Sequence, residues 1–475
     1  MSKPGASSEA SERGATESAL LGGRLAGKTL LGQVGVLAVW PLLEQVLTFC
    51  VGMTDLLISG RMSEGAERVA ILDAMGLGGY VAWFFNILQI AVATGVMALV
   101  SRATGGKQER LAKEGLGQGV WLGLTAGLIS MAVLLMAGPL LIKWIGLGPL
   151  AAERAEQYLR VFSYSGPFSG VLVAINAGLR GSGDTRTPFI GMVVVNGVNM
   201  LASWLLVFGP PGIGGRGIDG IALGTVIGWA AGLAVVVGVV AIPKVGELNW
   251  SVEGLRPNWP VMRRIIRVGA PQSLEIAGMW GIHAYGVRVI SSLPIEGALG
   301  AHILAIRVES MSFLPGFAIA TASAALVGQY LGAGSKEMAV KAVRLCWKIA
   351  LIVMTSMGVV FALAGRELVE LIAPASSMHV DLASPLLVVC AISQPFFATC
   401  IVLKTSMRGA GATAMVIYYA FGSMILIRVG VLAVASSLGL TSLLAVWIIL
   451  ALDMVSQAFI FTRLHFRGKW LDAKV

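Results

Sequence analysis

Charged side chains are scarce in this sequence. Only 13% of its 475 residues are Asp, Glu, Lys or Arg, whereas about 25% of residues are charged in an average soluble protein. A soluble fold of this size could not cover its surface with so few polar groups. Because 56% of the residues are hydrophobic and the mean hydropathy is +0.82, the composition excludes a soluble enzyme or a disordered protein and indicates a protein of the lipid bilayer.

Cysteine and histidine are rare as well, with four residues of each. The cysteines show no metal-ligand spacing and lie mostly in apolar runs, so no disulfide framework is expected. The histidines are scattered along the chain. We therefore expect no metal site and no bound cofactor. The cysteines are Cys50, Cys346, Cys390 and Cys400.

An apolar leader segment is also missing. Residues 1–29 are rich in Ser, Ala, Gly and Glu, and no hydrophobic segment precedes Leu20. A cleavable signal peptide requires an apolar core, and this polar composition is typical of disordered chain. We expect a disordered cytoplasmic tail over residues 1–29.

Long runs without any charge are frequent. A transmembrane helix needs about 20 mainly apolar residues, and ten charge-free runs indicate such helices. Two further apolar stretches carry internal acids: residues 30–60 contain Glu44 and Asp55, and residues 268–292 contain Glu275. Together they predict an all-α, polytopic membrane protein with twelve transmembrane helices. The ten runs cover residues 74–101, 115–142, 161–179, 187–215, 220–243, 310–335, 349–365, 382–403, 409–427 and 429–452.

The basic residues fall unevenly between the two sides of these helices. With both termini in the cytoplasm, the cytoplasmic segments hold 25 Lys and Arg residues and the external loops hold 7. Such a bias sets the orientation of membrane proteins, so we expect a multi-pass protein of the cell (inner) membrane with both termini cytoplasmic. The bias also explains the net charge of +10 without nucleic acid as a partner.

Two nucleotide-binding patterns lack the context that they require. Residues 22–29, GGRLAGKT, match a P-loop, but no buried strand or α/β domain surrounds them. Residues 212–217 match the dinucleotide fingerprint, but they lie in a short loop that opens a transmembrane helix. We expect no nucleotide ligand.

An internal repeat is the most informative feature. Ala93–Val100 recurs as Ala320–Val327, and Leu179–Thr185 recurs as Met407–Thr413, with offsets of 227 and 228 residues. An even number of helices separates the copies, so both have the same orientation in the membrane. The repeat predicts two pseudo-symmetric six-helix lobes with a substrate cavity between them, as in many secondary transporters.

The repeat also predicts the division of the chain. We expect an N-terminal lobe over residues 30–242, a cytoplasmic linker over 243–261, a C-terminal lobe over 262–465 and a cytoplasmic tail over 466–475. The joining loops are short, so a second soluble domain is excluded, and we expect a monomer.

Six short motifs, most of them at matching places in the two halves, form a recognisable pattern. They are Pro41–Gln45, Asp55–Gly60, Leu179–Thr185, Gly269–Pro271, Leu326–Gly334 and Arg408–Thr413. With them, the sequence resembles the multidrug and toxic compound extrusion (MATE) transporters over about residues 30 to 465. The resemblance implies alternating access and export of small organic, often cationic, compounds in exchange for H⁺ or Na⁺.

The sequence departs from the family pattern at two positions where the resemblance implies cation coupling. Ser203 stands where many members have an aspartate in the fifth helix, four residues after Asn199. The tenth helix reads QPFFA over residues 394–398, where some members have an acid. Coupling must therefore use other carboxylates or differ in mechanism.

Three acids inside the predicted spans are the candidate ion-coupling residues. A charge within the hydrocarbon costs at least about 3 kcal/mol on insertion scales, so an acid there is a functional candidate. Asp55 is the leading candidate, and Glu44 lies 11 residues before it, about 20° from the same helix face. Glu275 is the counterpart of Glu44 in the second half. The alternatives are an ion pair between Asp55 and Arg61 and structural hydrogen bonding of both glutamates.

Polar side chains within the spans are the candidate lining of the substrate cavity. For most of them, hydrogen bonding between helices is an equally good interpretation. They are Thr48, Gln89, Asn196, Asn199, Ser203 and Glu309.

We therefore predict a cation-coupled secondary exporter of organic compounds and no enzymatic activity. One alternative is a flippase for lipid-linked oligosaccharides from the same superfamily, which would need several cationic groups to hold pyrophosphate. Only Arg288, Arg307 and Arg428 are available within or beside spans. A membrane-embedded enzyme is the other alternative, but no catalytic cluster at functional spacing supports it.

Overall fold

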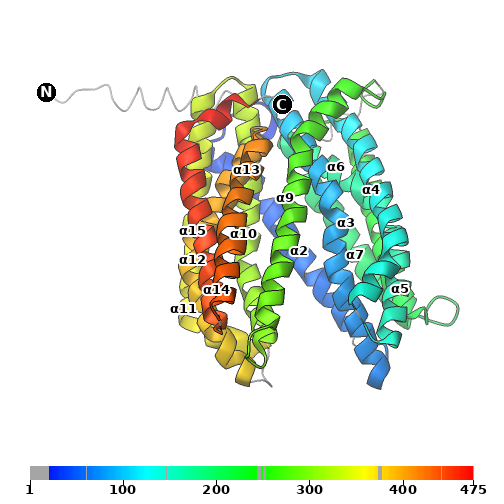
Figure 1. Ribbon diagram of the computed structural model, residues 1–475. Helices are drawn as coiled ribbons and strands as arrows, with labels where there is room; N and C mark the ends of the chain where they lie inside the picture. The colour runs from blue at the N-terminus through cyan, green and yellow to red at the C-terminus, as the bar shows by residue number, and fades with distance from the viewer. Residues whose placement is uncertain are drawn as a thin grey trace. The chain divides into compact units, whose positions relative to one another are not determined.

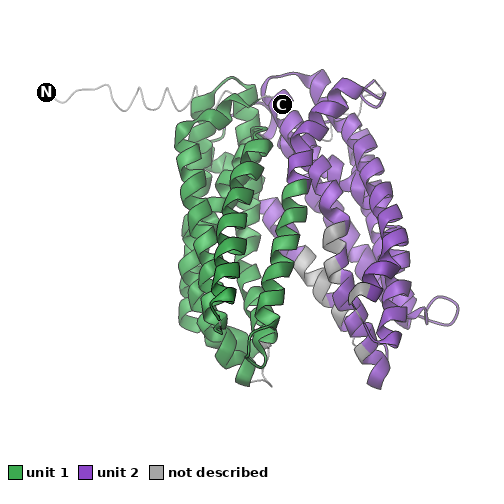
Figure 2. Ribbon diagram, viewed as in Figure 1, with its two compact units in different colours: residues 1–18, 28–38, 274–474 green, residues 19–27, 39–273, 475 purple. Residues whose placement is uncertain are grey.

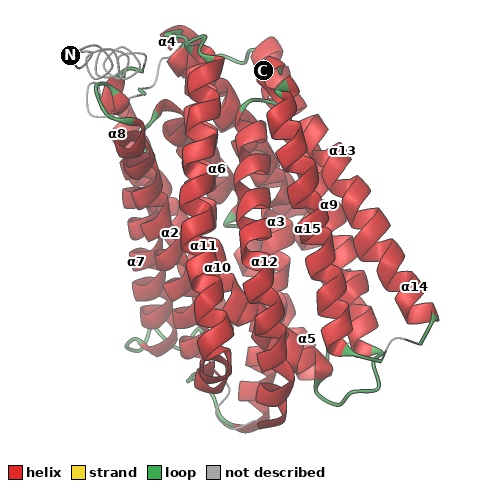
Figure 3. Ribbon diagram, turned by 90° about the vertical axis from the view of Figure 1, so that its left-hand side faces the viewer, coloured by secondary structure: helices red, strands yellow, loops and turns green. Residues whose placement is uncertain are grey.

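The computed structural model describes residues 21–59, 61–145, 147–242, 248–249, 253–372, 377–439 and 441–473. Every regular element in these ranges is a helix (Figure 3). The apolar runs dictate this outcome, because a segment that crosses lipid must pair its backbone N–H and C=O groups internally.

The first half of the chain forms six long helical segments (Figure 1). Only Tyr164 and Ser165 separate α5 from α6, so these two helices count as one segment. The helices are α2 (Leu30–Ser59), α3 (Gly65–Gly105), α4 (Glu109–Ile145), α5 (Pro149–Ser163), α6 (Gly166–Ser182), α7 (Arg186–Phe208) and α8 (Gly217–Ala241).

The second half repeats this plan. α13, the π-helix η2 and α14 follow one another without a gap and form one segment. The helices are α9 (Trp259–Ser291), α10 (Ala298–Gly332), α11 (Lys336–Ile372), α12 (Ser377–Gly409), α13 (Thr413–Ser423), η2 (Met424–Val431), α14 (Leu432–Ser437) and α15 (Leu443–Arg467).

Twelve segments in the described ranges thus match the predicted number of membrane spans. Ten are long and apolar enough to cross a membrane, and α9 and the α5–α6 pair supply the other two. The predicted spans 409–427 and 429–452 are wrong in their bounds. The charge-free runs place a boundary at Arg428, but the structure carries one helical segment through it over residues 413–437.

Contacts divide the chain into two compact units (Figure 2). Among the described residues, unit 1 comprises 28–38 and 274–473, and unit 2 comprises 21–27 and 39–273. Two helices therefore change unit along their length. α2 passes from unit 1 to unit 2 shortly before Pro41, and α9 passes from unit 2 to unit 1 shortly after Pro271.

The first turns of both crossing helices are firmly packed. In unit 1, the Tyr330 hydroxyl of α10 donates a hydrogen bond to the Gln33 side chain of α2, and both residues are buried. In unit 2, Gly269 of α9 lies against the backbone of Ala91 of α3, where a Cβ atom would come within 2.1 Å of the Ala91 carbonyl oxygen. Each unit is thus completed by turns from the other half of the sequence.

In unit 2, α7 and α8 pack closely because α8 presents glycines to α7 at every fourth position. Small residues allow helix backbones to approach each other in lipid, where apolar burial gives no driving force between helices. A Cβ atom at Gly228 would lie 2.6 Å from the carbonyl oxygen of Val195 and 3.0 Å from Cβ of Asn199. The glycines are Gly220, Gly224, Gly228 and Gly232.

Gly228→Ala should therefore destabilise unit 2 by about 1–3 kcal/mol, the usual cost of overpacking. The measurement is the thermal unfolding of the purified protein in detergent. Gly238→Ala is the matched control, because a Cβ atom there meets no heavy atom within 4 Å and alanine has the better helix propensity. Equal unfolding temperatures for the two variants would contradict the close packing of α7 on α8.

Candidate functional site

Asp55 lies in α2, four residues before the helix ends at Ser59. Its Oδ1 atom is buried and has no hydrogen-bond partner within the described residues. The ion pair with Arg61 that the sequence left open does not form in this part of the chain. Asp55 acts electrostatically on Tyr158 of α5. A buried carboxylate oxygen without a partner is costly, so this group favours a bound proton or cation.

Polar side chains of α7 and α8 form a cluster in the same unit. The Asn199 amide nitrogen donates to Thr225 Oγ1 over 3.1 Å and lies 3.4 Å from Ser203 Oγ. The Asn199 Oδ1 atom is buried and has no donor among the described residues, and the same holds for Asn176 Oδ1 of α6. Amide and hydroxyl oxygens of this kind are the ligands that hard cations prefer.

This polar cluster borders an apolar core that also reaches the helical turn after Asp55. Thr225 donates to the carbonyl oxygen of Ile221 over 3.2 Å. Ile221 belongs to the same buried cluster as Tyr158 and as Ile58, which follows Asp55 by one helical turn. The end of α2 near Asp55 and the polar cluster around Asn199 therefore lie beside the same apolar core.

The other predicted cavity residues are distributed unevenly. Gln89 and Asn196 are buried in unit 2 and keep unpartnered amide atoms among the described residues. Glu309 lies in unit 1, so it does not belong to the same cluster. The side chain of Thr48 lies outside the described residues. Thr225 and Asn176 were not predicted, because a single Thr or Asn in an apolar helix gives no distinctive pattern.

Both predicted glutamates are engaged in ion pairs. Glu44 accepts two hydrogen bonds of 2.6 Å from Arg180 of α6. Glu275 lies 2.7 Å from Arg408 and 3.0 Å from Lys404, both of α12. Each arginine comes from a repeated Arg-Gly-x-Gly motif. The acid and the motif arginine at corresponding positions of each half thus bind each other.

Asp453 directly follows the predicted span 429–452, a position at which a solvated carboxylate is expected. The structure places it in α15 with no exposed surface. It forms an ion pair with Arg428 of η2 over 3.0 Å and accepts hydrogen bonds from Ser423 and Gln457. Arg428 and Asp453 thus neutralise each other inside unit 1.

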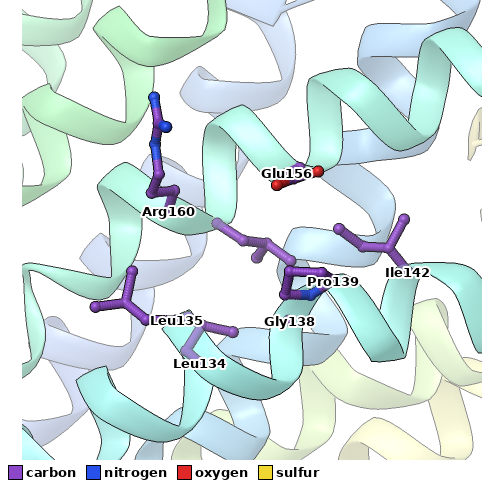
Figure 4. A pocket seen from close by; sticks show the side chains of 8 residues that line it. Leu134, Leu135, Gly138, Pro139, Ile142, Glu156 and Arg160 are labelled. Carbon is purple, nitrogen blue, oxygen red and sulfur yellow. The ribbon is translucent and has the colours of Figure 1, made fainter.

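A pocket of about 60 Å³ lies between α4 and α5 (Figure 4). Its lining is apolar except for Glu156 and Arg160, and it includes none of the predicted site residues. Its volume lies far below the roughly 300–1,000 Å³ of pockets that hold drug-sized ligands, so it is too small for such a ligand.

Comparisons with known proteins agree with this architecture. The model of the MatE family matches residues 42–205 and again residues 271–434, so each half of the repeat carries one match. A probable multidrug resistance protein NorM from Thermotoga maritima is 26% identical over 430 residues, which are 90% of either chain. A NorM protein from Rhodopseudomonas palustris is 24% identical over 387 residues, 80% of either chain.

Solved structures show the same fold. A transporter of the MOP superfamily from Pyrococcus furiosus has a TM-score of 0.86 at 18% identity, covering 97% of this chain and 99% of that chain. A eukaryotic MATE transporter has a TM-score of 0.81 at 15% identity, covering 93% of this chain and 97% of that chain. The duplicated family match over both six-helix halves decides the assignment: the chain belongs to the MatE family of multidrug and toxic compound extrusion transporters.

Proposed function

We propose that this transporter is an antiporter that exports organic, cationic or amphiphilic compounds in exchange for H⁺ or Na⁺. The observation that carries the proposal is the buried, unpartnered Oδ1 atom of Asp55. An exchanger needs a group that can be neutralised in more than one way, and a carboxylate without a fixed cation meets this need.

Asp55 is favoured over the two glutamates because each of those already has a cationic partner. Arg180 neutralises Glu44, and two cations face Glu275. A second positive ion would have to displace an arginine or lysine side chain from these sites. The two ion pairs therefore support a structural contribution from the glutamates.

Competition at Asp55 provides the coupling. A proton, a sodium ion and a cationic substrate would all neutralise the same carboxylate, so binding of one weakens binding of the others. By reciprocal linkage, the affinity for a cationic substrate falls as the pH falls through the range in which Asp55 takes up a proton. Asn199, Ser203 and Thr225 would supply the polar surroundings of the bound ion.

The test uses protein reconstituted in liposomes with separately imposed gradients of pH and Na⁺. We expect a cationic dye such as ethidium to be transported against its own gradient when at least one of the two ion gradients is present. Dissipating the effective gradient with an ionophore is the control. A dye transport rate that is independent of both the pH gradient and the Na⁺ gradient would refute cation coupling.

The structure gives the flippase alternative little support. Arg428 is already neutralised by Asp453, and Arg288 and Arg307 are exposed rather than gathered in an interior site. These three arginines were the only intramembrane cations that the sequence offered for a pyrophosphate group. A lipid substrate would therefore meet no cluster of available cations among them.

The proposed location is the cell (inner) membrane with both termini in the cytoplasm. Labelling of single cysteines tests the orientation at position 253, in the linker between the halves, and at position 469, near the C-terminus; both residues are exposed. Trp470 is unsuitable because it is only 1% exposed. A membrane-impermeant maleimide should label neither site in intact spheroplasts and both in inverted vesicles. Labelling of either cysteine from the outside would overturn the proposed orientation.

A further inference from the structure

A groove runs along the surface of unit 2 between α4 and α5. Its smaller part is the pocket of about 60 Å³ described above, with α4 on one side and α5 on the other (Figure 4). Its larger part has a volume of about 480 Å³ and shares Pro139, Ile142 and Glu156 with the smaller part. Together the two parts form the α4–α5 groove. A long molecule could therefore lie along it, although the smaller pocket alone holds no drug-sized ligand.

The apolar wall of the α4–α5 groove belongs to α4. Leu134, Leu135 and Ile142 line it, and on the same stretch of the helix Met136 and Leu140 are 79% and 69% exposed. Large apolar side chains that are exposed on a membrane-crossing helix contact acyl chains rather than water. The groove therefore opens at a lipid-facing surface of unit 2.

Two residues of α4 prepare this wall for a ligand. Gly138 leaves space unfilled, because a Cβ atom there would meet one side-chain atom within 4 Å, Cδ1 of Leu134 at 3.8 Å. Pro139 has no backbone N–H, so the carbonyl oxygen of Leu135 loses its usual helical donor. A carbonyl oxygen without a donor is costly within lipid. The groove thus has room for a chain beside Gly138 and favours a ligand that donates hydrogen bonds.

Four charged side chains also line the groove: Lys143 of α4 and Glu153, Glu156 and Arg160 of α5. All four are exposed, and none of them forms an ion pair or a side-chain hydrogen bond within the described part of the chain. By contrast, Arg154 of the same helix pairs with an acid of α3 over 2.9 Å. The groove therefore holds two positive and two negative groups that a ligand can engage.

These charges favour a zwitterion. Two carboxylates and two cations make the groove neutral overall, so an anionic headgroup gains no net attraction there. Arg160 and Lys143 can bind a phosphate, while Glu153 and Glu156 can accept hydrogen bonds from an ammonium group. A phospholipid with a primary amine carries both groups and an acyl chain for the apolar wall. A phosphocholine headgroup has the same charges but no N–H to donate.

We propose that the α4–α5 groove binds a phospholipid with a primary-amine headgroup, the chemistry of phosphatidylethanolamine. The phosphate binds Arg160 and Lys143, and the ammonium group binds the two glutamates. One acyl chain lies against α4 beside Gly138. The site includes none of the residues proposed for ion coupling, so it does not rest on the proposed antiport.

Native mass spectrometry of the purified protein tests the headgroup. The affinity for the first bound lipid is measured for phosphatidylethanolamine, phosphatidylcholine and phosphatidylglycerol with identical acyl chains. We expect phosphatidylethanolamine to bind roughly tenfold more tightly than the other two, because its ammonium group donates charge-assisted hydrogen bonds that a trimethylated ammonium lacks. Equal affinities, or a preference of the parent for phosphatidylglycerol, would overturn the proposal.

Two variants test the groove itself. The double variant Glu153→Gln, Glu156→Gln leaves two cations without acids, so its preference should change to the anionic phosphatidylglycerol. Gly138→Leu fills the space for the acyl chain and should weaken the binding of phosphatidylethanolamine. Both variants should unfold at the parent's temperature in lipid-free detergent, because the changed side chains are exposed or enter unfilled space. An unchanged preference for phosphatidylethanolamine in the double variant would overturn the site.

The controls are substitutions of the same kinds outside the groove. Glu367→Gln removes an exposed glutamate of α11, and Gly238→Leu adds a side chain to α8 where a Cβ atom meets no heavy atom within 4 Å. Both should bind phosphatidylethanolamine like the parent.

A photoactivatable phosphatidylethanolamine with a diazirine in its acyl chain locates the bound lipid. We expect crosslinks on the α4 peptide that contains residues 134–142, and we expect Gly138→Leu to lose them while Gly238→Leu keeps them. Crosslinks confined to other helices would overturn the site, whether or not the protein exports a dye.

Discussion

Replacing Asp55 by asparagine should reduce gradient-driven dye export to the level of protein-free liposomes while leaving the protein folded. The amide keeps the shape of the side chain but can take up neither a proton nor a cation. Its Oδ1 atom has no partner among the described residues to lose, so thermal unfolding should change little. Export driven by the imposed ion gradient, measured by dye fluorescence, checks the first part of this prediction.

The controls are other carboxylates of the same protein. Asp73→Asn removes an exposed acid of α3 and should export like the parent. Glu44→Gln and Glu275→Gln remove acids held in ion pairs, so we expect lower stability with export retained. A changed pH dependence of dye binding in either glutamine variant would instead assign that glutamate to coupling. Normal export by Asp55→Asn would place the coupling site elsewhere.

Asp453→Leu should cause the largest loss of stability of any substitution considered. It leaves the Arg428 guanidinium inside unit 1 without its carboxylate, and breaking a buried ion pair from one side costs about 3–5 kcal/mol. Gln457 and Ser423 also lose the acceptor that they share. We expect a large fall in the unfolding temperature in detergent and a lower yield of folded protein.

The double variant Arg428→Met, Asp453→Leu should recover much of this stability, because it removes both charges from a low-dielectric interior. The exposed ion pair between Arg366 and Asp381, 2.8 Å long, supplies the comparison. Asp381→Asn should leave the unfolding temperature nearly unchanged, since water screens that pair. If Asp453→Leu were tolerated as well as Asp381→Asn, the buried pair would contribute no stability.

The fold was largely predictable from the sequence because lipid imposes a simple rule on segment length and polarity. Twelve segments and the internal repeat follow from charge-free runs and matching motifs. Charge-free runs give wrong span boundaries where a charged residue lies inside a transmembrane helix. Arg428 interrupts an apolar run in the sequence, yet Asp453 compensates its charge from another helix. No local pattern could reveal a partner 25 residues away, and the last two span boundaries were misplaced for this reason.

The candidate site was less predictable. Asp55 is identifiable because an acid inside a predicted apolar span is rare, and the structure leaves its Oδ1 atom without a partner among the described residues. The repeat matches Glu44 with Glu275 and Arg180 with Arg408. It predicts an ion pair in each half only if the arginine of the motif lies within its helix, close to the glutamate, and not in a loop. The rings of His283 on α9 and His302 on α10 stack with centroids 6.2 Å apart, and no spacing along the chain predicts that contact.

The exchange of helix turns between the two units has a consequence for how the protein is made. Residues 28–38 emerge early from the ribosome, but they belong to the unit formed by residues 274–473. Tyr330, which binds Gln33, is synthesised almost 300 residues later. The N-terminal unit likewise lacks the start of α9 until that helix has been inserted. Neither unit can therefore reach its final packing before the second half of the chain enters the membrane, and folding of the two halves is obligately interleaved during biosynthesis.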